Sequence, residues 1–139
     1  MHLFAYGTLM CPKIITRVAG FLPGSFPARL DHYRRGPLSG VDYPAITPQR
    51  ESSVAGLLYL DLTPGTWHRL DEFEDKIYYR TVVNVSVGAG RTMVANSYVI
   101  RTEYLDRLGE AEWNYFEFLT SGRKRFEREY EGFPAPDHL

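Results

Sequence analysis

The segment YYRTVVNVSVGAGRTMVANSYVI, residues 78–100, is rich in β-branched and aromatic residues on both sides of a central glycine-containing triplet. Such residues fit the pleated surface of a sheet, and glycine readily adopts the positive φ that a tight turn requires. The pattern predicts two strands, Tyr78–Val87 and Arg91–Ile100, that pair through a hairpin turn at Gly88-Ala89-Gly90.

The residues before this hairpin predict a strand, a helix and an irregular region. Leu3–Tyr6 has the composition of a short buried strand, which ends at Gly7. Pro12–Ala19 is predicted as a short helix, because proline is favoured in a first helical turn and Gly20 follows its end. Residues 22–50 hold many prolines and glycines, which predicts extended segments and turns with strands that are short or at edges.

Two further segments have helix or strand signals. Ser53–Leu62 is an apolar run of strand length, and Thr63-Pro64 has the form of an N-cap followed by proline, which predicts a helix through about Glu74. Near the C-terminus, apolar residues recur at spacings of four and seven, which predicts one amphipathic helix over about residues 110–131. We expect Trp113 and Phe116 to pack within that segment.

The order of these elements indicates the fold class. Strands dominate and helices stand at the start, the middle and the end, which favours an α+β fold with a closed or highly curved mixed sheet over regular strand–helix alternation. The length of 139 residues predicts a single domain over residues 1–139. Its core would cover about 1–105, with a C-terminal helical extension at about 110–131.

The overall composition argues against several classes of function. Sixteen basic and seventeen acidic residues give a net charge of -1, so no broad cationic surface is available for nucleic acid. One cysteine, Cys11, and four scattered histidines predict neither an intrachain disulfide nor a metal site. No apolar stretch approaches the roughly 18 residues of a membrane span. We expect a cytoplasmic protein without a membrane partner, and the sequence gives no indication of the oligomeric state.

An acidic run, Leu70-Asp71-Glu72-Phe73-Glu74-Asp75, follows Trp67. On a helical wheel with about 100° per residue, Glu74 is the one carboxylate that falls inside the apolar arc. Burial disfavours the charged form of a carboxyl and raises its pKa, which suits a general acid or base near neutral pH. The alternatives are a solvated acidic face, or for Glu74 a buried structural carboxylate paired with Arg80 or with the amino end of another segment.

A second candidate site is the loop Tyr6-Gly7-Thr8-Leu9, where a buried strand ends at glycine just before a helix. Several backbone N–H groups can point into one concavity at such a position and bind a carboxylate or a developing oxyanion. The alternative is an ordinary turn in which Tyr6 belongs to the core.

A third candidate is the tyrosine-rich strand around Tyr78-Tyr79-Arg80. Alternation along a strand puts Tyr78 and Arg80 on one face and Tyr79 on the other, and Tyr98 of the partner strand offers a second hydroxyl. We expect Tyr78 and Tyr98 to contact a ligand, with core filling as the alternative.

Together these segments, in order and spacing, resemble the gamma-glutamylcyclotransferase-like family. The resemblance rests on motifs within roughly residues 1–100: Phe4-Ala5-Tyr6-Gly7-Thr8-Leu9, Tyr43-Pro44-Ala45, Val54-Ala55-Gly56-Leu57-Leu58-Tyr59, Leu70-Asp71-Glu72-Phe73-Glu74 and Tyr78-Tyr79-Arg80. It implies a small mixed β-barrel with surrounding helices. The predicted C-terminal helix lies outside the motifs and resembles an extension of bacterial-type members.

The resemblance also implies an activity, namely release of 5-oxoproline and a free amine from a small γ-glutamyl substrate, without a cofactor or metal. It implies that Glu74 is the acid/base and that Tyr6, Gly7, Thr8 and Leu9 hold the γ-glutamyl group. The Y-G-T-L loop is similar to that of the γ-glutamylamine branch. The alternative is a non-catalytic small-molecule binding or interaction module on the same barrel.

Overall fold

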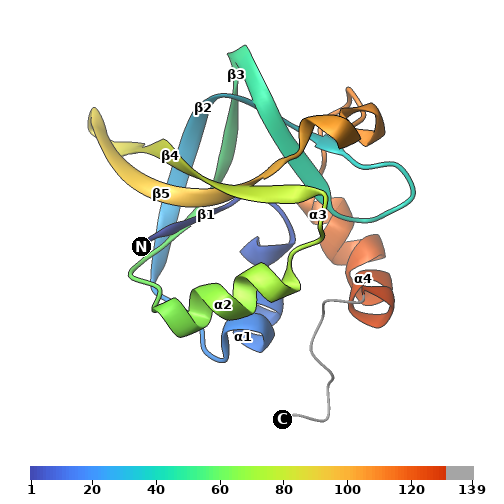
Figure 1. Ribbon diagram of the computed structural model, residues 1–139, viewed down its shortest axis with the longest axis horizontal. Helices are drawn as coiled ribbons and strands as arrows, with labels where there is room; N and C mark the ends of the chain where they lie inside the picture. The colour runs from blue at the N-terminus through green and yellow to red at the C-terminus, as the bar shows by residue number, and fades with distance from the viewer. Residues whose placement is uncertain (131–139) are drawn as a thin grey trace.

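The computed structural model describes residues 1–130 and contains a closed barrel with the strand order β1-β3-β2-β4-β5 (Figure 1). The strands are β1 (Leu3–Ala5), β2 (Ser25–Pro37), β3 (Pro44–Tyr59), β4 (Tyr78–Gly88) and β5 (Arg91–Ile100). The helical segments are η1 (Thr8–Met10), α1 (Pro12–Ala19), α2 (Pro64–Phe73), η2 (Thr102–Arg107), α3 (Tyr115–Glu117), η3 (Phe118–Gly122) and α4 (Arg123–Glu129).

The short strand β1 closes the barrel. It pairs antiparallel with β3, where Phe4 is opposite Leu58, and parallel with β5, where Leu3 is opposite Asn96. The sheet is therefore mixed, and the predicted α+β barrel with surrounding helices is confirmed. β4 and β5 form the predicted hairpin, in which Gly88 and Gly90 both have positive φ.

The proline-rich region departs from the prediction. β2 and β3 are long strands that pair from Ser25↔Tyr59 to Pro37↔Pro44, with one irregularity between Asp31 and Tyr33. β2 pairs with β4 at a single position, Arg29↔Ser86. Most of that side of β2 therefore makes no ladder of hydrogen bonds, and a proline, which lacks the backbone N–H, is tolerated there.

The first two long helices follow their sequence signals closely. α1 has the predicted bounds, and Gly20 at its C-cap has φ +89°. Thr63 caps α2 by accepting a hydrogen bond from the backbone N–H of Thr66. α2 ends at Phe73 with Glu74 as its C-cap, in agreement with the predicted end at about Glu74.

The C-terminal helix is present but shorter than predicted. It begins at Tyr115, after the N-cap Asn114, and runs through a π-helical segment, Phe118–Gly122, to Glu129. Residues 110–114 are not helical, and position 131 lies outside the described residues. Trp113 is buried, whereas Phe116 is 75% exposed, so the expectation that Phe116 packs inward is wrong.

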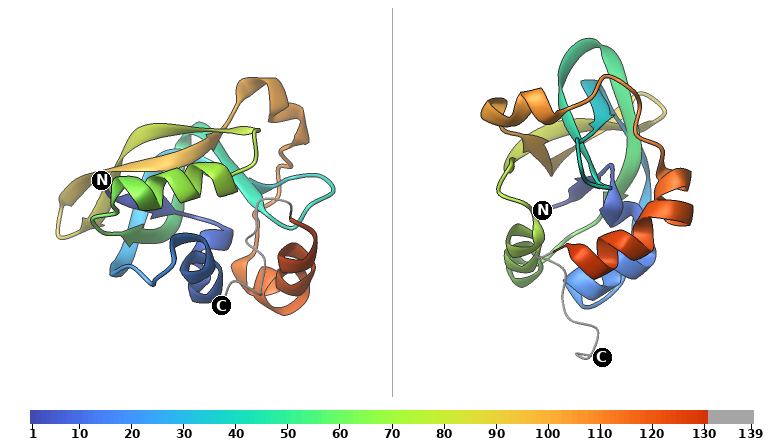
Figure 2. Two further views of the ribbon diagram at one scale, coloured as in Figure 1. Left: turned by 60° about the horizontal axis from the view of Figure 1, so that its bottom comes forward. Right: turned by 90° about the vertical axis from the view of Figure 1, so that its right-hand side faces the viewer.

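The core has two parts. One fills the barrel with strand residues such as Leu30, Val54 and Val85. The other lies between the barrel and the helices α1, α2 and α4, which lie on one side of it (Figure 2). None of the helices in residues 1–130 is long and apolar enough to cross a membrane. The helix-covered side of the barrel is where the site residues meet.

Candidate functional site

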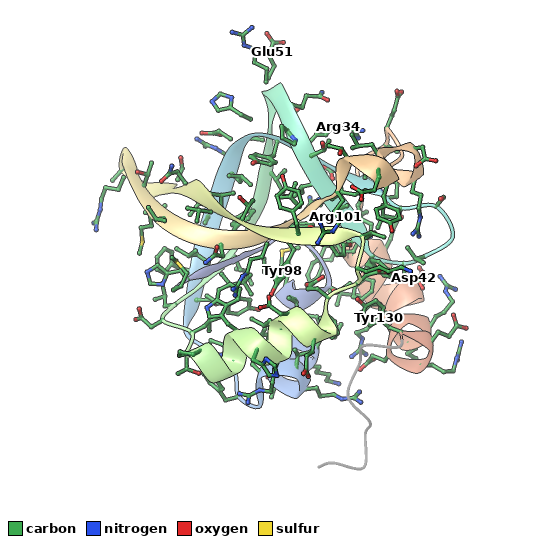
Figure 3. The ribbon with its side chains drawn as sticks, in the orientation of Figure 1. Arg34, Asp42, Glu51, Tyr98, Arg101 and Tyr130 are labelled. Carbon is green, nitrogen blue, oxygen red and sulfur yellow. The ribbon has the colours of Figure 1, made fainter. Side chains whose placement is uncertain are left out.

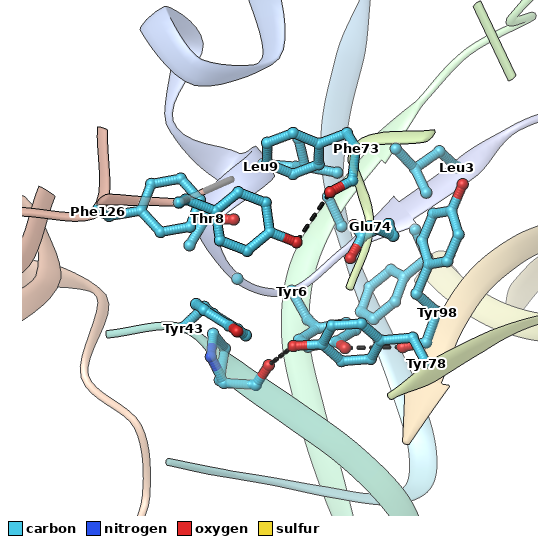
Figure 4. A pocket seen from close by; sticks show the side chains of 15 residues that line it. Leu3, Tyr6, Thr8, Leu9, Tyr43, Phe73, Glu74, Tyr78, Tyr98 and Phe126 are labelled. Atoms are coloured by element: carbon cyan, nitrogen blue, oxygen red, sulfur yellow. Dashed lines mark hydrogen bonds between the residues drawn. The ribbon is translucent and has the colours of Figure 1, made fainter. Parts of the chain in front are cut away.

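A pocket opens between the first strand, the end of α2 and the C-terminal helix (Figure 4). Its cavity volume is about 30 Å³, and the space between its walls continues into open solvent. All of the predicted site residues line it. The full lining consists of Leu3, Phe4, Ala5, Tyr6, Gly7, Thr8, Leu9, Tyr43, Pro44, Phe73, Glu74, Tyr78, Tyr98, Phe126 and Tyr130.

Glu74 enters this pocket from the C-cap of α2. Its backbone N–H donates to the carbonyl oxygen of Leu70 over 3.0 Å, and its extended conformation, ψ 139°, turns the chain out of the helix. The helical wheel thus correctly predicted that Glu74 faces inward, although Glu74 lies just outside the helix. Within residues 1–130, its carboxyl takes part in neither a hydrogen bond nor an ion pair.

The predicted alternative, a Glu74–Arg80 pair, is not formed. Arg80 Nη1 lies 3.5 Å from Asp71 Oδ2, and the guanidinium lies over the ring of Trp67, 4.6 Å from its centroid. Residue 80 is exposed on the outer side of β4. Arg80 therefore neutralises a neighbour of the site and leaves the Glu74 carboxyl without a counter-charge.

Burial raises the pKa of Glu74 to about 8, and the negative charges of Asp75 and Asp71 add to this effect. Glu74 is half-buried, and a carboxyl that is partly withdrawn from water and has no cation beside it favours its neutral form. A group with a pKa near 8 exchanges a proton readily at physiological pH. Residues 1–130 contain no group of three His, Cys, Asp or Glu side chains that could hold a metal ion.

The loop after β1 also lines the pocket, with Tyr6, Gly7, Thr8 and Leu9. The N–H groups of Met10 and Cys11 donate to the carbonyl oxygens of Gly7 and Thr8, as in a short 3₁₀ turn. Within the described chain, the N–H groups of Gly7, Thr8 and Leu9 donate to no protein acceptor. The loop thus has the unpaired donors that an anionic group would need.

The carbonyl groups of this loop are held from outside. Arg35 Nη1 donates to the carbonyl oxygen of Tyr6 over 2.7 Å, and the Tyr59 hydroxyl donates to that of Leu9 over 2.7 Å. The first bond fixes the Tyr6–Gly7 peptide, whose N–H belongs to Gly7 and has no protein acceptor in the described chain. The second fixes the Leu9–Met10 peptide, whose N–H is held by the carbonyl oxygen of Gly7.

The predicted tyrosines form walls, and their hydroxyls are already engaged. Tyr6 donates to the backbone oxygen of Tyr98 over 2.7 Å, and Tyr78 donates to that of Pro44 over 2.5 Å. Tyr98 donates to Asp71 Oδ1 over 2.7 Å. Burial raises the pKa of all three tyrosines, so they remain neutral donors. Their rings, more than their hydroxyls, face the pocket (Figure 4).

Sequence analysis missed the aromatic wall at the mouth. Phe126 and Tyr130 from the C-terminal helix stack at 4.7 Å between ring centroids, and the Tyr130 hydroxyl donates to the carbonyl oxygen of Phe73 over 2.8 Å. Tyr43 meets the Tyr130 ring at 5.2 Å. The spacing of Phe126 and Tyr130 predicts a packed stripe, but nothing in it predicts contact with residues 43 and 73.

Comparisons with known proteins agree with this architecture. A family model described as gamma-glutamyl cyclotransferase, AIG2-like, matches residues 3–115. AIG2-like protein D of Arabidopsis thaliana is 35% identical over 86 residues, which is 61% of this chain and 57% of that protein. The match therefore spans less than two thirds of that relative.

Solved structures share the fold. A solution structure of an Arabidopsis thaliana protein has a TM-score of 0.71 at 26% identity, covering 94% of this chain and 87% of that one. A structure titled gamma-glutamyl cyclotransferase has a TM-score of 0.64 at 17% identity, covering 98% of this chain and 89% of that one. At 17% identity the second likeness shows the fold alone.

Proposed function

Because this chain belongs to the gamma-glutamyl cyclotransferase, AIG2-like family, we propose that it converts γ-glutamyl compounds to 5-oxoproline with Glu74 as acid and base. The observation that carries the proposal is the Glu74 carboxyl, which lines the pocket without a bonding partner in residues 1–130 and has a pKa raised to about 8. Gly7, Thr8 and Leu9, whose amides have no protein acceptor in residues 1–130, line the same pocket.

The reaction needs only one substrate. The α-amine of the glutamyl group attacks the γ-carbonyl carbon, a carbon–nitrogen bond closes the five-membered lactam, and the bond from that carbon to the leaving nitrogen breaks. Glu74 as carboxylate accepts the proton lost by the attacking amine. Protonated Glu74 then returns this proton to the leaving nitrogen, so a free amine departs and the carboxylate is restored.

The pocket walls would contribute mainly by shaping the substrate. Both reacting atoms belong to one molecule, so holding the glutamyl chain in a folded conformation supplies much of the rate enhancement. We assign this role to the rings of Tyr6, Tyr78 and Tyr98. The N–H groups of Gly7, Thr8 and Leu9 would bind either the α-carboxylate or the oxyanion that develops on the γ-carbonyl oxygen.

The sequence of the loop supports a finer proposal on the substrate. Thr8-Leu9 resembles the loop of the γ-glutamylamine branch, so we expect the leaving group to be an amine more often than an amino acid. A panel should therefore contain γ-glutamyl alkylamines, γ-glutamyl amino acids and glutathione, each assayed for 5-oxoproline release.

The test also separates catalysis from binding. Turnover of at least one class by the parent protein, lost in Glu74→Gln and kept in Glu72→Gln, supports the cyclotransferase. Glu72 is a matched control, because it lies in the same acidic run but is exposed and paired with His68 over 2.9 Å. Saturable binding of γ-glutamyl compounds with no 5-oxoproline from any of them would favour the binding module.

A further inference from the structure

Two aspartates flank Glu74, and each accepts a hydrogen bond from a tyrosine of another part of the fold. The hydroxyl of Tyr43, which precedes β3, donates to Asp75 Oδ2 over 2.7 Å. The hydroxyl of Tyr98 donates to Asp71 Oδ1 over 2.7 Å, and Figure 3 shows Tyr98 between β5 and α2. Both tyrosines are buried, so the end of α2 is tied to the barrel on both sides of Glu74.

The other contacts of the two aspartates lead away from the pocket. Asp75 Oδ1 accepts from the backbone N–H of Ile77 over 3.2 Å, and Asp71 Oδ2 faces Arg80 Nη1 at 3.5 Å. All four oxygens of these carboxylates thus have contacts other than the Glu74 carboxyl. The aspartates fix the turn and add negative charge without satisfying Glu74 itself.

We infer that Asp75 and Asp71, held by Tyr43 and Tyr98, are positioning residues that aim Glu74 into the pocket and keep it a proton carrier at neutral pH. This inference rests on the proposed function for its catalytic meaning. Its physical content is the coupling of each aspartate to the Glu74 carboxyl, which is measurable without any substrate.

Among the groups in residues 1–130 that are coupled to Glu74, Asp71 and Asp75 are the two that carry a charge. The tyrosines electrostatically coupled to it are neutral, because burial raises each pKa: Tyr6, Tyr43, Tyr78, Tyr98 and Tyr130. Asp71 is 44% exposed and lies beside Arg80, whereas Asp75 is less exposed. Because water and the Arg80 charge screen Asp71, Asp75 has the stronger effect on the pKa of Glu74.

The charge component is tested by a titration of the Glu74 carboxyl, followed by ¹³C NMR and assigned with Glu74→Gln. In Asp75→Asn the titration midpoint should fall on the order of one pH unit, because a neighbouring negative charge is lost. Asp71→Asn should lower it by less, and the control Glu72→Gln should leave it unchanged. A midpoint in Asp75→Asn within error of the control would overturn the inference.

The positioning component is tested with Tyr43→Phe and Tyr98→Phe, which remove the tethering hydroxyls and keep both aspartate charges. We expect kcat to fall on the order of tenfold, because a slightly misplaced catalytic group is costly, while the Glu74 midpoint stays high. Tyr79→Phe is the matched control, because Tyr79 is 39% exposed and does not line the pocket. Unchanged kcat in both tether variants would refute the positioning role.

The two proposals fail in different ways. If the midpoint shifts as expected but the parent protein forms no 5-oxoproline at any pH, the cyclotransferase proposal fails and the coupling stands. If turnover depends on Glu74 but neither aspartate variant alters the titration midpoint of Glu74, the cyclotransferase proposal stands and the inference about the two aspartates fails.

Discussion

Gly7 lies so close to the ring of Pro44 that a β-carbon on residue 7 would stand 2.8 Å from Pro44 Cγ. No ordinary side-chain contact is that short, so any larger residue must displace either the loop or the start of β3. The φ of Gly7 is −136°, which means that small size, and not a left-handed conformation, is the property required here.

Gly7→Ala should therefore shift the N–H groups of the loop while the barrel stays folded. We expect KM for a γ-glutamyl substrate to rise on the order of tenfold or more, since the displaced donors no longer match the bound group. Steady-state kinetics with a circular dichroism melt checks this. Gly24→Ala is the control, because a β-carbon there meets nothing within 4 Å; equal KM values in the two variants would remove the loop from the site.

Glu74→Gln keeps the shape of the side chain and removes its ability to carry a proton. The expected loss in kcat is on the order of 10² to 10⁴, with substrate affinity largely retained. In the parent protein, the proposed activity should rise with pH as Glu74 loses its proton around its pKa of about 8. A pH profile of kcat measures this limb, and a flat profile between pH 6 and 9 would contradict the assigned role.

Glu74 should also make the free energy of unfolding depend on pH. Its pKa is about 8 in the folded protein against an ordinary value of 4.5, so the folded state binds the extra proton between these values. The stabilisation is fully present below pH 4.5 and is lost as pH rises through 8. Urea unfolding at pH 5, 7 and 9 should show Glu74→Gln gaining stability relative to the parent as pH rises. A difference that stays constant with pH would show that Glu74 is not desolvated.

Trp113 and Phe116 lie close in sequence but should respond very differently to truncation. Trp113 is buried and its indole N–H donates to the carbonyl oxygen of Asp42 over 2.9 Å, so Trp113→Ala should cost about 3 to 5 kcal/mol of stability. Phe116 is exposed, and Phe116→Ala should be nearly neutral. Chemical denaturation of the two variants tests the pair, and similar losses would mean that the C-terminal helix packs by a different face.

Local sequence signals predicted the elements that local chemistry determines. Proline and glycine gave the bounds of α1, Thr63 gave the start of α2, and the triplet Gly88-Ala89-Gly90 gave the β4–β5 turn. The long β2–β3 pairing was missed, because prolines weaken a strand signal and the sequence alone does not reveal that β2 has a nearly unpaired side.

For the site, the sequence identified the residues but not all of their neighbours. Glu74 was singled out by a wheel that extends one residue past the true helix, and it still faces inward because the chain turns there. The engagement of Tyr98 with Asp71, and of Tyr43 with Asp75, depends on contacts between segments more than 25 residues apart, which spacing within one segment cannot reveal.

The closure of the barrel by β1 has a consequence for how the site assembles during folding. β1 lies near the N-terminus, yet its partner position in β5 is Asn96, so this contact joins segments far apart in the chain. Contacts of such long sequence separation form slowly, because closing a large loop costs conformational entropy before the contact energy is gained. The loop that follows β1 is held by Tyr59 of β3 and Arg35 of β2, so its order also depends on segments far along the chain. We expect the N–H groups of Gly7 to Leu9 to gain their fixed geometry in the last steps of folding.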